Sequence, residues 1–445
     1  MSDMYKQEVP LYGQLLDLVK SVNEPLQHSL SLDERQRLTQ ERHGAIRVGK
    51  ASELRNLARL FRLMGMEPVG YYDLSVANLP VHATAFRPIS TESLMENPFR
   101  VFTSLLRLDL IEDEMTRELA RETLDKREIF SARALEMIQK AEEQGGVSDD
   151  EAQEFVVCAL QTFAFNVQSL VGEADYDRLR KASPLVADIA SFATPHINHL
   201  TPCTLDIDAI QQGMASRGIP PKSIIEGPPA RICPILLRQT SFTALEEPIV
   251  FPSQNQTDSM RLGAHKARFG EIEARGAALT MKGKALFADL FKRARDTEVD
   301  VTKSSHGDFE ANEIHQAHLQ RFFCEFPDDW ETLRKNGLVF VRYEVVEDAT
   351  RQEMNTHQTL NDLVERGLVK YKPIVYEDFL PASAAGIFTS NLGATKANQI
   401  TGRPDQAAFE ADLGRPVLHA DTLYRQMQDE SIKMVLARYP GVRLC

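Results

Sequence analysis

The spacing of apolar residues predicts helices through most of the first 190 residues. Apolar positions between Leu11 and Val22 recur at helical intervals, and a second helix is predicted from Ser52, as its N-cap, to Gly65. Residues 112–145 are dense in charged residues and are predicted to form solvated helices, and residues 148–171 a further helix. Short extended pieces at 68–72 and 81–86 interrupt them, so this region is predicted to be mainly helical.

From about residue 191 the pattern changes to short β-rich runs separated by turns. Strands are predicted at 197–200, 224–225, 232–238, 249–251, 268–280, 338–346 and 369–376. Residues 283–295 are predicted to be helical, 296–311 a polar surface loop, and the last helix to run from Ala420 to Tyr439. Because no stretch has the composition of a linker, we expect one compact α+β catalytic unit over residues 1–445. Its expected parts are a mainly helical region (1–190), a β-rich core (191–390) and a C-terminal tail with a helix (391–445).

Charge and cysteine usage narrow the classes of function. The chain has 51 basic and 64 acidic residues and a formal net charge of −13, which argues against nucleic acid as the main partner. A small anionic substrate is compatible with this charge, because a few arginines in a pocket hold a carboxylate whatever the net charge. Five cysteines without a CxxC pair predict neither a disulfide framework nor a zinc–thiolate site. No signal peptide or membrane span is expected, so the predicted compartment is the cytoplasm.

The common phosphate-binding and serine-hydrolase motifs are absent, which leaves histidine, carboxylate and arginine as candidate chemistry. The first cluster lies in residues 41–49, where His43 and Arg47 stand four residues apart. If this segment is helical, both side chains face the same side. The pair would combine a metal ligand with a guanidinium that grips a carboxylate. The alternative is a surface histidine near a surface arginine.

Two further clusters lie in the β-rich region. His196 and His199 would point to opposite faces of a strand, so one can be a ligand but a chelating pair is not expected. The alternative for either is a hydrogen-bonded core histidine. On a strand, Glu271, Glu273 and Arg275 would share one face. They fit either a solvated sheet surface or a metal ligand with its supporting groups.

A fourth segment, residues 376–388, is rich in small residues around Ala382 and Ser383. Its exposed backbone N–H groups suit carboxylate recognition, and the alternative is a tight turn packed in the core. Two histidines and one carboxylate from separate segments are the ligand set of non-haem Fe(II) oxygenases.

These four clusters carry a resemblance to a known family. The segments 41–49, 196–202, 268–276 and 379–388 resemble the 2-oxoadipate dioxygenase/decarboxylase family, whose members are also called hydroxyglutarate synthases. Segments 71–75, 84–88, 98–107 and 234–242 extend the likeness, which covers about residues 4 to 425. The family belongs to the vicinal oxygen chelate superfamily, so the resemblance implies a cupped β-sheet around a metal.

The resemblance also implies roles for individual residues. It implies an Fe(II) site of His43, His199 and Glu271, with Glu273 as the alternative carboxylate. It implies that Arg47 holds the substrate carboxylate, beside His43, His199 and the backbone of Ala382, where the family often has Val. Weaker candidates for the substrate site are Ser383, Arg87, Arg275 and His196, of which Arg87 and Arg275 are rivals of Arg47 and His196 is not expected to bind the metal.

The implied reaction converts 2-oxoadipate and O2 to 2-hydroxyglutarate and CO2, as in lysine catabolism. The 2-oxo acid would chelate Fe(II) through its carboxylate and keto oxygens, lose that carboxyl as CO2 and be hydroxylated on the adjacent carbon. No external 2-oxo acid is then needed. Two alternatives stay open at this point. They are a zinc-dependent hydrolase or lyase on the same ligands and a non-catalytic protein that binds 2-oxo acids.

Overall fold

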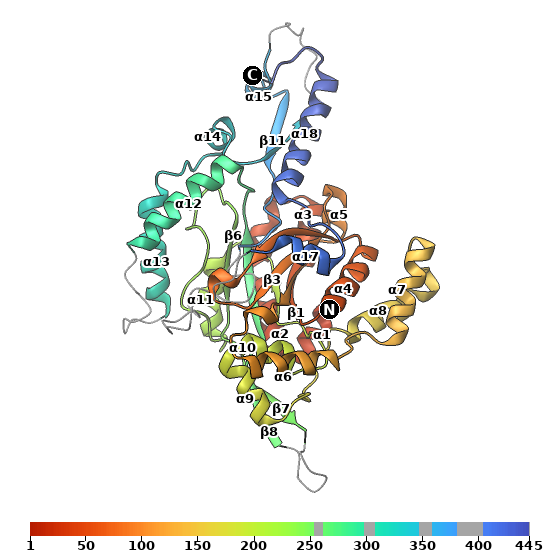
Figure 1. Ribbon diagram of the computed structural model, residues 1–445. Helices are drawn as coiled ribbons and strands as arrows, with labels where there is room; N and C mark the ends of the chain where they lie inside the picture. The colour runs from red at the N-terminus through yellow and green to blue at the C-terminus, as the bar shows by residue number, and fades with distance from the viewer. Residues whose placement is uncertain (253–260, 298–307, 347–357, 381–403, 445) are drawn as a thin grey trace. The chain divides into compact units, whose positions relative to one another are not determined.

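The computed structural model describes residues 1–252, 261–297, 308–346, 358–380 and 404–444, which divide into two compact units (Figure 1). The first unit comprises Met1–Glu226, Gln239–Ala274 and Phe379–Leu418, and the second comprises Gly227–Arg238, Arg275–Asp378 and His419–Cys445. Each is described by itself below. The expected single catalytic unit, with internal boundaries near residues 190 and 390, stays a prediction.

A seven-stranded sheet in the order β2-β3-β4-β1-β5-β9-β6 forms the centre of the first unit. Its strands are β1 (Arg42–Val48), β2 (Glu67–Asp73), β3 (Val81–Arg87), β4 (Phe99–Leu106), β5 (His199–Pro202), β6 (Leu237–Ser241) and β9 (Phe269–Arg275). β1 runs parallel to β4 and antiparallel to β5, and β5 runs parallel to β9. The sheet is curled into a half-barrel, as the resemblance implied (Figure 1). β7 (Glu247–Phe251) and β8 (Arg261–His265) form a separate hairpin.

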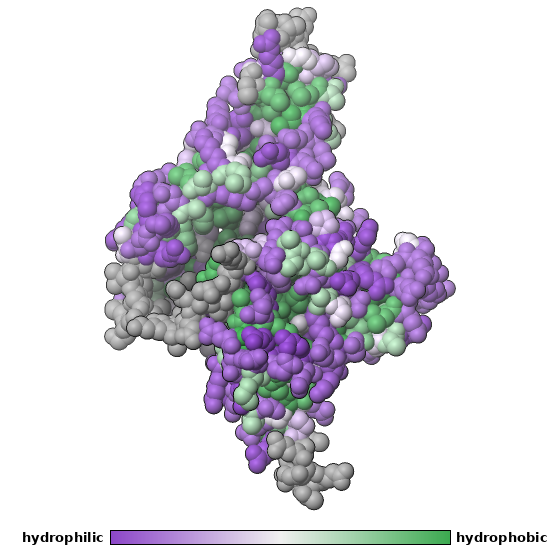
Figure 2. All heavy atoms as spheres, in the orientation of Figure 1, coloured by the Kyte–Doolittle hydropathy of each residue, from purple (hydrophilic) through white to green (hydrophobic). Residues whose placement is uncertain are grey.

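Helices cover the sheet and enclose two apolar cores. They are α1 (Ser2–Glu8), α2 (Pro10–Leu26), α3 (Leu32–Gln40), α4 (Ala51–Leu63), α5 (Thr91–Glu96), α6 (Glu114–Asp125), α7 (Ala132–Gln144), α8 (Asp149–Gln161), α9 (Glu173–Ala182), α10 (Pro184–Ala190), α11 (Ile207–Ser216) and α17 (Gln406–Leu413). One core joins α2 and α4 to Ile46, Leu200 and Ile272 of the sheet. Hydrophilic residues cover most of the visible surface of α7, as predicted for the solvated helices of residues 112–145 (Figure 2).

The segment around His43 is a strand, β1, so the helical geometry considered for it does not apply. The apolar residues Ile46 and Val48 alternate with His43, Ala45 and Arg47, and nearly every residue of the strand is buried. A short run that is buried on both faces of a sheet cannot be distinguished from a buried helical segment by periodicity alone. β4 was not predicted for the same reason, since it is a continuous buried run.

Other differences concern the ends of elements. α4 begins at Ala51 and not after Ser52, because the Glu53 carboxylate accepts hydrogen bonds from the backbone N–H groups of Gly49 and Lys50. The helix predicted over 148–171 ends at Gln161, and the Ser169 N–H then donates to the Val250 carbonyl of β7. No strand forms at 224–225, and the strand predicted over 232–238 is β6, which begins only at Leu237.

The second unit combines helices with a two-stranded antiparallel sheet of β10 and β11. Its elements are α12 (Met281–Asp296), α13 (Asp308–Phe323), α14 (Trp330–Lys335), β10 (Val341–Val345), α15 (Leu360–Glu365), β11 (Val369–Pro373) and α18 (Ala420–Arg438). α13 includes residues 308–311, which were predicted to be loop. α18 packs along β10, where the Tyr343 N–H donates to the Ser431 hydroxyl. None of the helices in the described ranges combines the length and apolar character that a membrane crossing requires.

Candidate metal centre

Strand register gathers the candidate ligands on one face of three adjacent strands. Ala45 of β1 pairs with His199 of β5, and His199 pairs with Phe269 of β9. Paired residues lie on the same face, and side chains alternate faces along a strand. His43 and Arg47 therefore share the face of Ala45. Glu271 and Glu273 share the face of Phe269, so the four polar side chains and His199 point to the same side of the sheet.

Close packing on the opposite face holds these strands in place. A Cβ added to Gly270 would lie 2.4 Å from the Phe242 ring and 2.9 Å from Leu15 of α2. A side chain at this position of β9, between Phe269 and Glu271, would therefore displace the Phe242 ring and Leu15. The adjoining Ile272 is fully buried in the same apolar core.

His43 lies between two carboxylates. Its Nδ1 is hydrogen-bonded to Glu273 Oε2 at 2.9 Å, and its Nε2 lies 2.9 Å from Glu271 Oε1. The second contact lacks the alignment of a hydrogen bond. Glu273 thus holds the Nδ1 nitrogen of the His43 ring, while the Glu271 carboxylate and His43 Nε2 are directed toward the same position. This division of the two carboxylates resembles a histidine ligand with its carboxylate partner.

Glu271 and His199 are held by further neighbours. Glu271 Oε1 accepts hydrogen bonds from Thr201 Oγ1 at 3.1 Å and from Gln239 Nε2 at 2.7 Å. His199 Nε2 lies 4.0 Å from the same oxygen, and its ring stacks on Phe269 with centroids 4.9 Å apart. These contacts limit the rotation of both side chains, so the site is organised before any ligand binds.

Three donor atoms converge in the buried centre of this face. His43, His199 and Glu271 each offer one atom, and the three atoms lie within 4.8 Å of one another. All three side chains have no exposed surface. Within the described residues, neither ring nitrogen of His199 has a hydrogen-bond partner, and nor does Glu271 Oε2. Buried polar atoms without partners are costly, and a metal ion bound by these atoms would remove that cost.

Electrostatics prepare the two histidines differently. Burial and the positive charges of His43 and Arg47 hold the pKa of His199 well below its usual range, so its imidazole is neutral, as metal binding requires. Burial would lower the pKa of His43, but the Glu273 and Glu271 carboxylates outweigh it and raise the pKa. Burial also raises the pKa of Glu271 against the effect of His43.

Arg47 lies further along β1 and contacts another acidic side chain. Its Nη1 donates to Asp188 Oδ2 of α10 at 2.6 Å. His196 precedes β5 and is not on a strand, so the predicted strand geometry does not apply to it. It lies outside the group formed by His43, His199 and Glu271, and its Nε2 is 3.2 Å from Asp188 Oδ1.

The other predicted substrate residues lie in different surroundings. Arg87, at the end of β3, is fully buried and donates to the Pro88 carbonyl at 3.0 Å. Arg275, at the end of β9, donates to the carbonyls of Tyr376 and Asp378. Ala382 and Ser383 lie outside the described residues.

Several residues of this region were not found from the sequence. Thr201 and Gln239 support Glu271, Asp188 contacts Arg47, and Arg100 lies in register with His43 on β4. His265 contacts Asp188. Only Thr201 had a signal, since it lies two residues after His199 and so shares its strand face. The others come from segments whose contacts with the site depend on tertiary packing.

Comparisons with known proteins agree on one family. The model of the 2-oxoadipate dioxygenase/decarboxylase family matches residues 1–391. The 2-oxoadipate dioxygenase/decarboxylase of Pseudomonas putida is 50% identical over 97% of this chain and 94% of its own length. The Escherichia coli protein of the same name is 49% identical over 97% of this chain and 95% of its own. The crystal structure of the hydroxyglutarate synthase from Pseudomonas putida in complex with 2-oxoadipate has a TM-score of 0.86 and 48% identity. The match covers 98% of this chain and 95% of the chain in that structure. This chain therefore belongs to the 2-oxoadipate dioxygenase/decarboxylase family.

Proposed function

We propose that this protein is an Fe(II)-dependent dioxygenase that converts 2-oxoadipate and O2 to 2-hydroxyglutarate and CO2. The observation that carries the proposal is the buried group of His43, His199 and Glu271 in a chain of this family. Two histidines and one carboxylate are the ligand set of non-haem Fe(II) oxygenases, which leaves coordination positions for substrate and dioxygen. Bound there, Fe(II) would supply the site at which the 2-oxo acid and O2 react.

The residues around the ligands orient the atoms that would bind the metal. Glu273 accepts the Nδ1 proton of His43, which leaves His43 Nε2 as the metal-binding nitrogen. Thr201 and Gln239 donate to Glu271 Oε1 and so favour its ionised form. The Phe269 ring contacts His199, and the Phe379 ring contacts His43. These apolar rings exclude water from the sides of the two histidines that they cover.

Arg47 is proposed to hold the carboxylate of the substrate that lies far from the metal. It shares a strand face with His43, about 13 Å further along at the usual rise of ~3.3 Å per residue. A six-carbon diacid and an arginine side chain together bridge this gap. Without a cation the second carboxylate would be buried unpaired, at a cost of several kcal/mol. Arg47 would thereby select a dicarboxylic substrate and orient the carbon that is hydroxylated.

Reconstitution with metal tests the function. The purified protein is loaded anaerobically with Fe(II), mixed with 2-oxoadipate and exposed to O2. We expect one O2 consumed and one CO2 and one 2-hydroxyglutarate formed per substrate, and no turnover in a Zn(II)-loaded control. Turnover with Zn(II) would support a hydrolase or lyase instead. Binding of 2-oxoadipate without O2 uptake would indicate a non-catalytic binding protein.

The role of Arg47 is tested with a matched pair of substrates. 2-Oxohexanoate has the chain length of 2-oxoadipate but lacks the distal carboxylate. Arg47→Lys should retain Fe(II) but lose most of the preference for 2-oxoadipate, because lysine does not reproduce the planar fork. Arg87→Lys and Arg275→Lys are the controls for the two rival arginines. An unchanged ratio of kcat/KM between the substrates in Arg47→Lys would remove this role from Arg47.

A further inference from the structure

A second group of two histidines and one carboxylate lies in the same unit. Asp188, His196 and His265 each offer an atom within 4.8 Å of the others, and all three are buried. His265 Nε2 lies 2.9 Å from Asp188 Oδ1, and His196 Nε2 lies 3.2 Å from the same oxygen. On donor types alone this group equals the candidate metal centre.

The neighbours of Asp188 give it a different role. Its Oδ2 accepts hydrogen bonds from Arg47 Nη1 at 2.6 Å and from Asn198 Nδ2 at 3.1 Å. Its Oδ1 is hydrogen-bonded to His265, so both oxygens already have partners. A divalent cation here would lie next to the Arg47 guanidinium and would displace these donors. Repulsion between like charges in a buried region makes this unfavourable.

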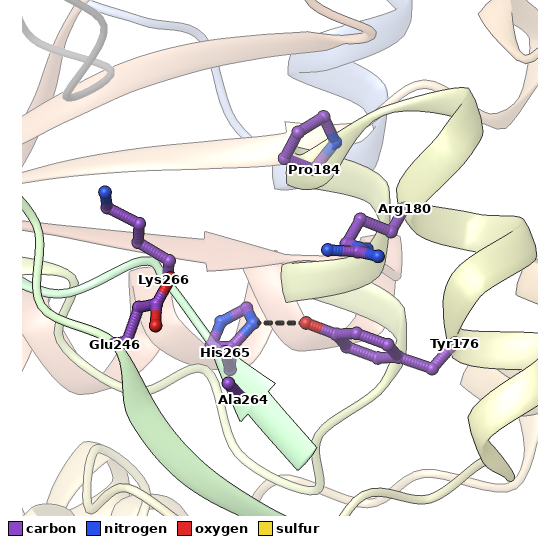
Figure 3. Close-up of a pocket in the computed structure, with 7 residues that line it drawn as sticks. All are labelled: Tyr176, Arg180, Pro184, Glu246, Ala264, His265 and Lys266. Carbon is purple, nitrogen blue, oxygen red and sulfur yellow. Dashed lines mark hydrogen bonds between the residues drawn. The ribbon is translucent and has the colours of Figure 1, made fainter.

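His265 is held at both of its ring nitrogens. Its Nδ1 is hydrogen-bonded to the Tyr176 hydroxyl at 2.8 Å (Figure 3). Burial raises the pKa of Tyr176 to about 12, so its hydroxyl keeps the proton and can donate it to Nδ1. His265 Nε2 then carries the proton that is donated to Asp188. The His265 ring also packs on Phe192, with centroids 4.7 Å apart.

We propose that Asp188 is the positioning residue of Arg47, and that Tyr176 and His265 keep the Asp188 carboxylate in the orientation this requires. The inference rests on the proposed function, in which Arg47 holds the distal carboxylate of the substrate. The Tyr176–His265–Asp188–Arg47 chain joins α9, β8, α10 and β1. It anchors one edge of the guanidinium, so the plane of the fork is set before the substrate arrives. Preorganisation of this kind lowers the cost of ordering the side chain on binding.

Substitution of Asp188 separates positioning from a simple charge effect. Asp188→Asn removes a negative charge beside Arg47, so a pure counter-charge role predicts tighter binding of a dianionic substrate. A positioning role predicts weaker binding, because the new amide group would face the donors of His265 or Arg47. The direction of the change in affinity therefore distinguishes the two roles.

The experiment measures binding anaerobically, so that no turnover occurs. Isothermal titration of the Fe(II)-loaded protein with 2-oxoadipate and with 2-oxohexanoate gives two dissociation constants for each variant. For Asp188→Asn we expect unchanged iron content, binding of 2-oxoadipate weaker by up to ~100-fold, and little change for 2-oxohexanoate. His265→Phe keeps the ring packing but removes the donor and should have a smaller effect. Tyr176→Phe should have the smallest effect of the three.

Two controls keep the test decisive. Lys266 is the exposed neighbour of His265 and lines the surface pocket that Tyr176 and His265 also line (Figure 3). Lys266→Met should therefore bind both acids like the wild type. The double variant Arg47→Lys with Asp188→Asn should discriminate between the two acids as well as Arg47→Lys alone, because both changes remove the same interaction. If Asp188→Asn does not fold, as judged by circular dichroism, His265→Phe and Tyr176→Phe decide the proposal.

Three results would overturn it. The first is a ratio of the dissociation constants for 2-oxoadipate and 2-oxohexanoate that equals the wild-type ratio, either in Asp188→Asn or in both His265→Phe and Tyr176→Phe. The second is tighter binding of 2-oxoadipate. The third is a second bound metal ion that is lost in Asp188→Asn and His265→Phe, which would make this group a metal site. If the wild type neither binds nor converts 2-oxoadipate, the proposed function itself fails. If the wild type and Arg47→Lys behave as proposed, only the role of Asp188 is rejected.

Discussion

The two histidine–carboxylate groups of the first unit have the same donor types but different electrostatic surroundings. His43, His199 and Glu271 lie with a second carboxylate, Glu273, which is hydrogen-bonded to His43. In the other group, the Asp188 carboxylate pairs directly with the Arg47 guanidinium. The first group therefore has an excess of negative charge, and the second has its carboxylate already neutralised. A cation is attracted to the first and repelled from the second.

The hydrogen bonds of the two carboxylates differ in the same sense. Glu271 Oε2 has no hydrogen-bond partner among the described residues, whereas both oxygens of Asp188 are hydrogen-bonded, and the ring nitrogens of His199 and His196 are alike without such a partner there. A buried carboxylate is stable without a cation only when its oxygens have other partners. The comparison teaches that ligand type and spacing are not sufficient to identify a metal site. The counter-charge and the unsatisfied atoms must be examined as well.

Loss of a metal ligand should produce the largest difference between the groups. His199→Ala or Glu271→Ala should remove most of the bound iron, because two remaining ligands chelate poorly. The effect on affinity should exceed the ~10–100-fold that is typical of supporting residues. Iron content is measured after anaerobic loading and gel filtration, with His265→Phe as the matched histidine control. Full iron occupancy in His199→Ala would sink the assignment of the first group.

Loss of the supporting carboxylate should have an intermediate effect. Glu273→Gln keeps the size of the side chain but removes the charge that orients His43. We expect Fe(II) affinity to fall by ~10–100-fold, with full occupancy recovered at high metal concentration. Competition with a chelator measures the affinity, and Glu246→Gln, at an exposed glutamate of the same unit, is the control. If Glu273→Gln bound no metal at any concentration, Glu273 would have to be counted as a ligand itself.

The smallest expected effect is on acid stability of the second group. Burial would raise the pKa of Asp188, but Arg47 and His196 outweigh it and hold the pKa well below 3.8, its ordinary value. A lowered carboxyl pKa stabilises the fold above the unfolded pKa, and this contribution is lost as the pH falls toward the folded pKa. The difference in Tm between the wild type and Asp188→Asn should thus be constant near neutral pH and narrow below about pH 4. A difference that widens on acidification would contradict the ion pair.

The sequence motifs identified much of the candidate metal centre. His43, His199 and Glu271 lie in three short segments that each resemble a family motif, and the structure brings their donor atoms within 4.8 Å of one another. The shared face of Glu271 and Glu273 followed from strand periodicity and is confirmed by β9. Which carboxylate faces the two histidines did not follow, because both have the same face and the same charge.

Whether the segment of β1 is a helix or a strand makes little difference to the site, for a simple geometric reason. His43 and Arg47 stand four residues apart, and an interval of four places two side chains on one side of a helix and also on one face of a strand. His43 and Arg47 therefore share a side although the element is a strand and not the helix considered from the sequence. An interval of three would have given opposite answers.

The sequence by itself determined the residue types, the local periodicity and the family of this protein. These properties depend on neighbours along the chain, which a single segment contains. Only the tertiary structure decided that β1, β5 and β9 are adjacent, and that Asp188 and His265 meet Arg47. Such contacts join segments far apart in the chain, and they are set by the packing of α2 and α10 against the sheet and not by any local pattern. The distinction between a metal site and an arginine-positioning group depends on these contacts, because it depends on which charges become neighbours after folding.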